Sequence, residues 1–506
     1  MRMDNSNLEI DNSQKKINIG IFCDSFFPMI DGVVNVMDNY AKRLIKYANV
    51  TVFAPQGRDK NFKDDFPYKV VRCTKKFKCP GLDYDLPLPE MDSDFMDAIE
   101  QSNLDIVHIH SPFSIGKVAL NYAKQHKIPC VATCHSQFKK DFYEATKSNL
   151  LTGIMMNNIM PTFEKCEECW AVNKQVAKLY HDEYKLKIMP KVKNNGTEMK
   201  YYDNKQKVDE LRKSLNIADD EKILLFVGRL HILKNIFFIL DSLEYLKQKN
   251  FKFKMIFVGT GPDEKEFKAK IHEKNLDKDI ILTGRISDRE TLAKYFNMAD
   301  LFLFPSLYDC SSLVQIEAAS QKTPSLFLYG AVTSGTCTEN VDAYFSENDP
   351  EKYADKIIDI FANTDEYKQI CQGAFDNLYV SWDEAVDRIY NDYLDVIKKY
   401  KEGYYTKLKK YIKLKIPVKK KVVKKRKNQE QKDKKLLAQQ ERKSKANQKK
   451  QLAELAKKEK RAKLTKQKTE KTLERKTKIG EQKQRKIKEK LIKSTKLQNK
   501  KHESNL

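Results

Sequence analysis

The chain has 506 residues and a formal net charge of +25, from 95 Lys and Arg against 70 Asp and Glu. Residues 401–506 hold 41 of the basic but only 11 of the acidic residues, which leaves 54 and 59 in residues 1–400. No apolar run approaches the roughly 20 residues that a membrane-crossing helix needs. We therefore expect a mildly acidic body of two or three domains and a basic tail, with any membrane contact peripheral.

The termini and the cysteines indicate a reducing compartment. Residues 1–16 are polar, lack the apolar core of a secretory signal, and are expected to be disordered. The ten cysteines are scattered, which suits a cytoplasmic protein. Cys166 and Cys169 form a CxxC, but no second pair at zinc spacing accompanies them, so a metal or redox role is not indicated.

The first element is a continuous apolar strand at 17–23, typical of a parallel sheet buried on both faces. A loop containing Gly32 follows it, and then a helical pattern runs to about Lys46. Strand, glycine-containing loop and helix open a nucleotide-type α/β unit. Gly32 would let the backbone approach a phosphate, although a plain turn glycine explains it equally well.

Polar residues stand at the ends of three of the strands predicted before residue 200. The strands are expected at 17–23, 50–54, 68–72, 105–110, 129–133 and 170–173, with a helix at 116–126. Because carboxyl ends of parallel strands meet at one edge, Asp24, His110 and His135 should lie close together there. His135 has the more polar surroundings and is the better candidate for a site. His108 alternates with apolar neighbours and is expected to be structural.

Residues 138–165 carry aromatic, Lys and Met positions at helical spacing. They could form an acceptor-binding or membrane-facing surface, or they could simply be the core face of helices.

A second α/β series begins at Lys222. Its strands are expected at 223–227, 254–258, 279–284, 301–304 and 325–329, and its helices at 236–248 and 288–297. Two similar halves in tandem imply a cleft between them. Arg229 and Lys234 follow the first strand of this series. Two cations beside amide donors can neutralise a diphosphate, although isolated surface Arg and Lys residues are common.

The stretch 301–321 combines a buried strand, a polar turn and a helix. Asp309 precedes the helix and Glu317 lies inside it. The turn and first helical turn contribute capping groups and amide donors: Ser311, Ser312, Leu313 and Val314. A helix N-terminus suits phosphate, and carboxylates accept hydrogen bonds from sugar hydroxyls. The stretch therefore suggests a nucleotide-sugar site, the alternative being an ordinary strand–loop–helix joint.

The C-terminal region changes character. Residues 381–400 are expected to form an amphipathic helix, and 404–418 interleave Tyr, Leu and Ile with Lys, as in a helix that lies on an anionic membrane. From Lys419 the tail is rich in Lys, Gln and Glu and cannot bury a core. It is expected to be helical or disordered, and a membrane surface, nucleic acid or plain solubilisation are the uses left open.

Taken together, the segments FFPMIDGV, HIHSPFSIG, TCHS, FVGRLHILKN, VGTGPDE, LTGRIS and FPSLYDCSSLVQIEAAS resemble the retaining glycosyltransferases of family 4. The resemblance covers roughly residues 17–400. It implies an α/β protein of the GT-B fold, with two Rossmann-like domains and parallel sheets facing across a cleft. The implied boundaries are an acceptor domain at 17–200, a nucleotide-sugar domain at 201–380, a helix at 381–400 returning to the first domain, and a tail at 401–506.

The resemblance also assigns roles to single residues. Arg229 and Lys234 match the diphosphate-binding pair, Glu317 the ribose-binding Glu, and Asp309 the residue near the donor sugar hydroxyls. Three further matches are Gly32 near the donor phosphates, His135 near the sugar, and the backbone of Arg285 and Ile286 at the base. His135, Arg229, Lys234 and Asp309 are thus the expected catalytic residues. No metal or other cofactor is expected, because cationic side chains and helix amides take over that role.

Two departures from the family pattern concern the sugar end of the site. Asp309 stands where the family usually has the longer Glu, and Cys310 to Ser312 replace a segment that is usually rich in glycine. The loop 329–338 also departs from the common pattern.

Within the family, the N-terminal sequence looks most like those of bacterial diacylglycerol glucosyltransferases. That implies transfer of glucose from UDP-glucose to a membrane lipid at the inner face of the cell membrane, with the basic tail on the anionic surface. The alternatives are a polysaccharide or protein glycosyltransferase, or a catalytically weak protein that binds membrane or RNA.

Overall fold

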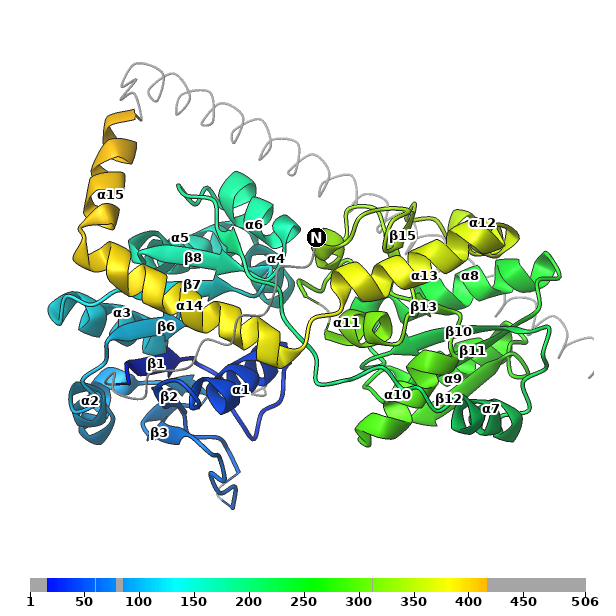
Figure 1. Cartoon of the computed structure of the whole chain (residues 1–506), viewed down its shortest axis with the longest axis horizontal. Helices are drawn as coiled ribbons and strands as arrows, with labels where there is room; N and C mark the ends of the chain where they lie inside the picture. Colours follow the sequence, from blue (N-terminus) through cyan, green and yellow to red (C-terminus); the bar gives the residue numbers. More distant parts are fainter. Residues whose placement is uncertain (1–15, 60, 79–84, 312, 416–506) are drawn as a thin grey trace, which may run out of the picture. The chain divides into compact units, whose positions relative to one another are not determined.

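The computed structural model describes residues 16–59, 61–78, 85–311 and 313–415 (Figure 1). The described residues as far as Lys409 form one compact unit that contains two parallel sheets. We call residues 16–199 together with helix α14 the N-terminal half, and residues 200–380 the C-terminal half. The predicted parts of the tail from residue 416 onward lie outside the described residues.

The N-terminal half is built on a seven-stranded sheet with strand order β3-β2-β1-β6-β7-β8-β9, in which every pair is parallel. Its strands are β1 (Asn18–Phe22), β2 (Asn49–Pro55), β3 (Lys69–Cys73), β6 (Ile106–Ile109), β7 (Cys130–Cys134), β8 (Glu168–Ala171) and β9 (Lys191–Val192). Its helices are α1 (Gly32–Leu44), α2 (Ser93–Glu100), α3 (Ser114–Gln125), α4 (Phe138–Thr146), α5 (Asn149–Lys165) and α6 (Lys174–Lys178). A short antiparallel pair, β4 (Lys76–Phe77) and β5 (Leu86–Pro87), lies beside it.

The C-terminal half is built on a six-stranded parallel sheet with strand order β12-β11-β10-β13-β14-β15. Its strands are β10 (Lys222–Val227), β11 (Phe253–Val258), β12 (Ile280–Gly284), β13 (Leu301–Leu303), β14 (Ser325–Leu328) and β15 (Tyr344–Ser346). Its helices are α7 (Lys205–Ser214), α8 (Ile236–Gln248), α9 (Glu264–Glu273), α10 (Arg289–Met298), α11 (Leu313–Ser320), α12 (Pro350–Ala362) and α13 (Thr364–Leu378).

These elements form where the sequence places continuous apolar runs. Strands β1, β6, β7 and β13 are buried almost throughout, because helices cover both faces of a parallel sheet. The predicted strands and helices are present, and so is the α/β class. The pattern did not identify α2, α7, α12, α13, the short pair β4 and β5, or the edge strand β15. None of the described helices combines the length and apolarity needed to cross a membrane.

The chain passes between the halves at two neighbouring segments. Thr197 and Ser381 form a parallel bridge, in which the Thr197 N–H donates to the Val380 carbonyl at 2.9 Å and the Trp382 N–H donates to the Thr197 carbonyl at 3.2 Å. A Cβ on Gly196 would lie 2.8 Å from the Ser381 backbone, so only glycine allows this approach.

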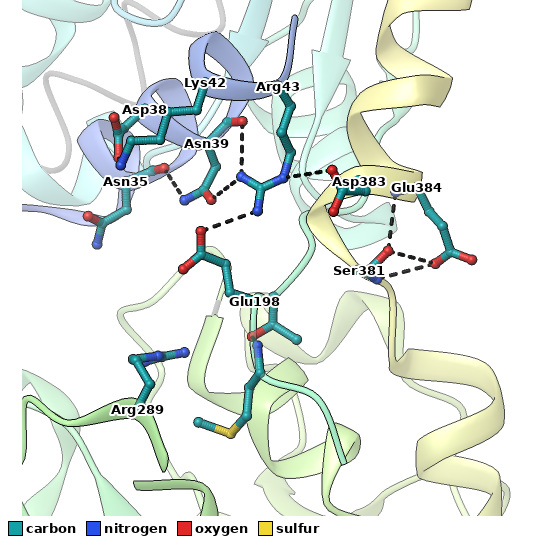
Figure 2. Close-up of polar contacts among 12 residues, drawn as sticks. Asn35, Asp38, Asn39, Lys42, Arg43, Glu198, Arg289, Ser381, Asp383 and Glu384 are labelled. Atoms are coloured by element: carbon teal, nitrogen blue, oxygen red, sulfur yellow. Dashed lines mark hydrogen bonds and ion pairs between the residues drawn. The ribbon is translucent and has the colours of Figure 1, made fainter. Parts of the chain in front are cut away.

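Helix α14 (Trp382–Lys401) starts at this crossing and packs along α1. Ser381 and Glu384 form a capping box that fixes its first turn. Arg43 of α1 joins both crossing segments: its Nη2 lies 3.2 Å from Glu198 Oε1 and its Nε 3.4 Å from Asp383 Oδ1, while its Nη1 donates to Asn39 Oδ1 at 2.8 Å (Figure 2). One guanidinium thus ties the two connections to α1.

The segment expected to lie on a membrane forms helix α15 (Tyr404–Lys415). Its Tyr405 does not face outward: the ring is buried in the N-terminal half and its hydroxyl donates to Glu168 Oε1 at 2.7 Å. Lys409 pairs with Glu167 at 2.9 Å. The helix prediction was therefore correct, but the prediction that these residues face a membrane is wrong for Tyr405, because packing in the N-terminal half buries its ring.

His108 is structural, as predicted. Its ring is fully buried, with Nδ1 2.6 Å from the Tyr393 hydroxyl on α14 and Nε2 2.7 Å from Thr133 Oγ1 on β7. Burial lowers the pKa of His108 well below its usual value, so the ring is neutral.

Replacing Tyr393→Phe removes the only partner of His108 Nδ1 among the described residues. We expect the free energy of unfolding to fall by about 1–3 kcal/mol, because a buried ring nitrogen loses its hydrogen bond. Denaturant unfolding of the purified protein measures the change.

The matched control is Tyr47→Phe. The Tyr47 hydroxyl donates to Asp387, which lies on α14 as Tyr393 does, but this hydrogen bond is exposed. The control variant should change the free energy of unfolding by less than about 0.5 kcal/mol. Equal losses in the two variants would contradict the structural role of the buried pair.

Candidate active site

Both halves share one topological feature that fixes where a ligand can bind. In each sheet the strand order reverses beside the first strand, between β1 and β6 and between β10 and β13. Loops that leave these neighbouring strands run in opposite directions and open a crevice at the carboxyl edge. The expected site residues that the structure describes all lie behind the carboxyl end of a strand or on the helix that follows it.

A cavity of about 270 Å³ lies where the two crevices meet. Its lining comes from both halves: Asp31, Gly32, Val33, Val36, His135, Ser136, Gln137, Asp141 and Asn195 from the first, and Tyr308, Asp309, Cys310, Ser311 and Leu313 from the second. Five expected site residues, Gly32, His135, Asp309, Ser311 and Leu313, therefore line one cavity. Arg229, Lys234, Arg285, Ile286, Val314 and Glu317 do not line it.

Asp309 is joined to a cation and a hydroxyl. Lys234 Nζ donates to Asp309 Oδ1, and Ser306 Oγ donates to Oδ2 at 2.6 Å. Lys234 ends a short 3₁₀ turn (Ile232–Lys234) that leads into α8. The sequence predicted Lys234 and Asp309 in one site, and the structure brings their charges into contact. The pair leaves the lysine partly exposed at the end of β10.

Glu317 points one oxygen at a cation and leaves the other without a partner. Its Oε1 accepts from Arg289 Nη2 at 2.6 Å. Its Oε2 is buried and has no hydrogen-bond partner among the described residues. A buried carboxylate oxygen without a donor is costly, so this atom is an open acceptor for a ligand hydroxyl. The sequence did not indicate Arg289.

Arg229 follows β10 directly, and its side chain is exposed and makes no ion pair with another described residue. The loop around it is tightly packed: a Cβ on Gly259 would lie 1.9 Å from the Gly228 carbonyl oxygen, and one on Gly261 2.0 Å from that of Leu230. Two glycines after β11 thus support the backbone that carries Arg229. A guanidinium in this position is available to an anion.

Arg285 and Ile286 follow β12, which β11 and β10 separate from β13 in the sheet. Arg285 is exposed, whereas Ile286 packs partly against the core of the C-terminal half. The backbone turn between strand and loop uses Gly284 at φ +72°.

His135 follows β7, and its ring stacks on that of His110 with Nε2 2.9 Å from His110 Nδ1. Burial lowers the pKa of His135 to about 3 and that of His110 well below its usual value. Both rings are therefore neutral at physiological pH, and one nitrogen donates to the other. Asp24 lies at the same edge of the sheet, where it accepts hydrogen bonds from Ser111, which follows His110, and from Ser114 and the Ile115 N–H.

Gly32 is the first residue of α1, after the N-cap Asp31, whose Oδ1 accepts from the Val34 N–H at 2.8 Å. A Cβ on Gly32 would meet nothing within 4 Å. Its φ is not in the left-handed region, so the backbone does not demand glycine here. The space in front of it is part of the cavity, at the positive end of a helix.

The start of α11 contributes the remaining predicted groups. Ser311 Oγ accepts from Asn195 Nδ2 at 2.9 Å, Leu313 packs on the core of the N-terminal half, and Val314 packs on that of the C-terminal half. Ser312 lies outside the described residues.

The polar residues of the cavity that were not predicted as site residues are Asp31, Ser136, Gln137, Asp141, Asn195 and Tyr308. Burial raises the pKa of Asp31 and, despite the hydroxyl of Tyr308 that donates to it, that of Asp141. Asp31 could have been found from its position as a helix cap before Gly32. Asp141 and Gln137 carry no local signal, because their role arises from contact with residues far away in the chain.

The CxxC pair is not assembled with other metal ligands in the described part of the chain, where no cluster of three or more His, Cys, Asp or Glu suits a metal ion. Cys166 Sγ lies 3.6 Å from Cys130 Sγ, and both thiols are buried with raised pKa.

The sequence matches two family models in the order of the two halves. Residues 30–193 match "Glycosyltransferase Family 4", and residues 207–376 match "Glycosyl transferases group 1". Among characterised relatives, alpha-monoglucosyldiacylglycerol synthase of Streptococcus pneumoniae is 25% identical over 322 residues, which cover 61% of this chain and 70% of that protein. The enzyme of the same name from Acholeplasma laidlawii is 25% identical over 354 residues, covering 66% and 86%.

Solved structures agree on the fold. A glycosyltransferase from Rickettsia africae superposes with a TM-score of 0.59 at 19% identity, covering 76% of this chain and 100% of that one. Anabaena Alr3699/HepE, in complex with UDP and glucose, superposes with a TM-score of 0.57 at 16% identity, covering 74% and 99%. The chain therefore belongs to glycosyltransferase family 4, with the GT-B fold, and is an enzyme that transfers a sugar from a nucleotide-sugar to an acceptor.

Proposed function

We propose that this enzyme transfers glucose from UDP-glucose to a membrane lipid such as 1,2-diacylglycerol, with retention of configuration, at the cytoplasmic face of the membrane. The sugar and the acceptor class follow the two relatives named alpha-monoglucosyldiacylglycerol synthase, and UDP follows the resemblance noted in the sequence. One observation carries the choice of a lipid acceptor: an exposed apolar surface next to the helix that lines the cavity.

That surface lies on the first turns of α5. Leu150 is 74% exposed, Leu151 48% and Ile154 56%, whereas the same helix buries Thr152. Apolar side chains outside and a polar one inside are the reverse of an ordinary surface helix. Such a cluster marks a contact with another molecule or with lipid.

The surface is connected to the cavity through α4, which packs on α5. Gln137 at the cap of α4 and Asp141 in its first turn line the cavity. Acyl chains in a bilayer next to α5 would leave the hydroxyl of the lipid within reach of the cavity mouth. The exposed Lys139 on α4 suits an anionic lipid surface. Attachment through the basic tail stays a prediction, since residues 416–506 lie outside the described part.

In this proposal the donor binds along the C-terminal half. Arg229 and Lys234 neutralise the diphosphate, the free Oε2 of Glu317 accepts from the ribose, and the backbone at Arg285 and Ile286 contacts the base. Asp309 accepts from the sugar hydroxyls at the cavity, opposite Gly32 and His135. A neutral His135 suits this position because it can donate or accept a hydrogen bond without repelling a developing positive charge on the sugar.

The positive charge for the leaving diphosphate comes from side chains and helix amides in this proposal, so a divalent metal is not required. The exposed guanidinium of Arg229, the ammonium of Lys234 and the start of α11 are placed at the end of β10 and behind β13. The leaving diphosphate takes the proton of the acceptor hydroxyl on the same face of the sugar.

The direct test is turnover of a panel of radiolabelled nucleotide-sugars by the purified full chain, with and without anionic vesicles that contain diacylglycerol. We expect label from UDP-glucose in the lipid fraction as an α-glucoside. Activity should persist in EDTA, because Arg229 and Lys234 carry the charge that a metal would supply.

Donor cleavage without lipid labelling would refute the lipid acceptor and leave a polysaccharide or protein acceptor. Loss of activity in EDTA, restored by a divalent ion, would refute the metal-free part. If no nucleotide-sugar is bound or cleaved, the departures at Asp309 and Cys310 have produced a binding protein.

The α5 surface makes a separate prediction. A triple variant, Leu150→Ser, Leu151→Ser and Ile154→Ser, should weaken vesicle binding by about tenfold or more, since each side chain loses the gain from burial in the acyl region. Sedimentation with vesicles measures binding, and UDP affinity should not change because α5 does not contact the donor residues.

Met91→Ser is the control, since Met91 is 70% exposed on a different surface of the same half. It should leave vesicle binding unchanged. Equal binding by the triple variant and the native protein would remove α5 from the membrane contact.

The diphosphate pair is tested by Arg229→Ala and Lys234→Ala. Each should lower kcat/KM by about 100-fold or more, because one charge on the leaving group is lost in a site that excludes water. The measurement is the rate of UDP release at varied donor concentration. Lys265→Ala, an exposed lysine on α9, is the matched control and should keep native activity; native activity in both site variants would exclude the assigned role.

A further inference from the structure

The loop that carries Asp309 is held by the opposite half of the molecule. We call residues 306–311 the Asp309 loop. It connects β13 with α11 in the C-terminal half, and it lines the cavity through Tyr308 to Ser311. Four side chains of the N-terminal half donate hydrogen bonds to it: Gln137, Lys140, Asn173 and Asn195.

The first part of the loop is held by α4. Gln137 Nε2 donates to the carbonyls of Leu307 at 3.2 Å and Tyr308 at 2.7 Å, and Lys140 Nζ donates to the Leu307 carbonyl at 3.1 Å. Lys140 also lies 5.4 Å from the centre of the Tyr308 ring, whose hydroxyl donates to Asp141. Two consecutive carbonyls thus take their donors from one helix start across the cavity.

The second part is held by α6. Asn173 Nδ2 donates to the Cys310 carbonyl at 2.6 Å, while its Oδ1 accepts from the Val176 N–H and caps α6. Asn173 is 1% exposed. Cys310 is 8% exposed and packs into a buried apolar cluster whose other buried members all belong to the N-terminal half.

The C-terminal half holds the loop through the Leu307 side chain, which packs on its core, and through polar contacts at Asp309. Ser306 Oγ contacts the Leu233 carbonyl at 3.4 Å and Asp309 Oδ2 at 2.6 Å, and Lys234 pairs with Asp309. The carbonyls on either side of Asp309 therefore accept hydrogen bonds from the N-terminal half, whereas the carboxylate of Asp309 is held by the C-terminal half.

We propose that Asn173 and Gln137 are positioning residues for the transfer: by holding the Asp309 loop from the opposite half, they complete the sugar end of the donor site only while the two halves are in contact. This inference rests on the proposed role of Asp309 at the donor sugar. It adds that nucleotide binding and sugar activation are separable, since the residues placed at the nucleotide, apart from Gly32, lie within the C-terminal half.

Asn173→Asp is the sharpest test, because aspartate caps a helix as well as asparagine does. One carboxylate oxygen still accepts from the Val176 N–H, whereas the other faces the Cys310 carbonyl and repels it. We expect UDP affinity by calorimetry to stay at the native value, and kcat for UDP release from UDP-glucose to fall by about tenfold or more. Asn204→Asp makes the same change at the exposed cap of α7 and should leave kcat unchanged.

A pH profile separates positioning from general damage. As the pH falls, the introduced carboxyl becomes protonated and regains a donor for the Cys310 carbonyl. The ratio of variant to native kcat should therefore rise toward acid pH. A constant ratio, or equal kcat in the two proteins, would overturn the proposal. If Asn173→Asp fails to fold, Gln137→Met removes two of the hydrogen bonds at similar side-chain length, and its kcat decides in the same way.

The readout does not depend on the acceptor. If the native enzyme cleaves UDP-glucose but labels no lipid, the proposed acceptor is wrong, and the inference is still decided by the cleavage rates. If the native enzyme cleaves no donor, hydrogen exchange of the loop decides: faster exchange over 306–311 in the variant, with α6 unchanged, supports the proposal, and equal exchange overturns it.

Discussion

The arrangement of this site depends on one constraint, the reversal of strand order beside the first strand of each parallel sheet. Because β1 and β10 each have neighbours whose crossovers run in opposite directions, the loops at their carboxyl ends diverge and leave a crevice. The loop before α1 and the loop after β13 fill the two crevices, and the cavity forms where they meet. Gly32, His135 and Asp309 are far apart in the chain and become neighbours for this reason.

The same constraint explains how much could be predicted from the sequence. Buried strands read as short apolar runs, and the polar residues that end them mark the carboxyl edge, so His110 and His135 could be placed together. Only the family resemblance put Lys234, Asp309 and His135 in one site. Edge strand β15 is only three residues long and was missed. Gln137 and Asp141 were also missed, because they lie in an ordinary helical pattern and acquire their role through contact with a loop some 170 residues away.

Carboxylates at the site are kept ordered by cations of the same half. Asp309 pairs with Lys234 and Glu317 with Arg289, so neither charge is buried alone. Each ion pair still leaves a group that a ligand can contact. Lys234 is partly exposed, and Glu317 Oε2 has no donor among the described residues. The carboxylates of the C-terminal half are thus balanced by cations, while the exposed guanidinium of Arg229 and the open acceptor Glu317 Oε2 are available to a ligand. Periodicity and motif spacing identified the anionic partners, but Arg289 could not be found, since its pairing depends on the packing of α10 against α11.

The replacement of the family's glycine-rich segment after Asp309 has a structural consequence. A glycine-rich loop would be free to adjust its backbone around a longer glutamate. Here Cys310 has a side chain, and burying it in the N-terminal half removes apolar surface from water and fixes the backbone one residue beyond Asp309. An aspartate has a shorter reach, so the position of its backbone decides whether the carboxylate meets the sugar. Three carbonyls bonded to Gln137 and Asn173 set that position. If Asp309 binds the donor sugar as proposed, the N-terminal half therefore controls the geometry of the sugar end of the site, which neither half could establish alone.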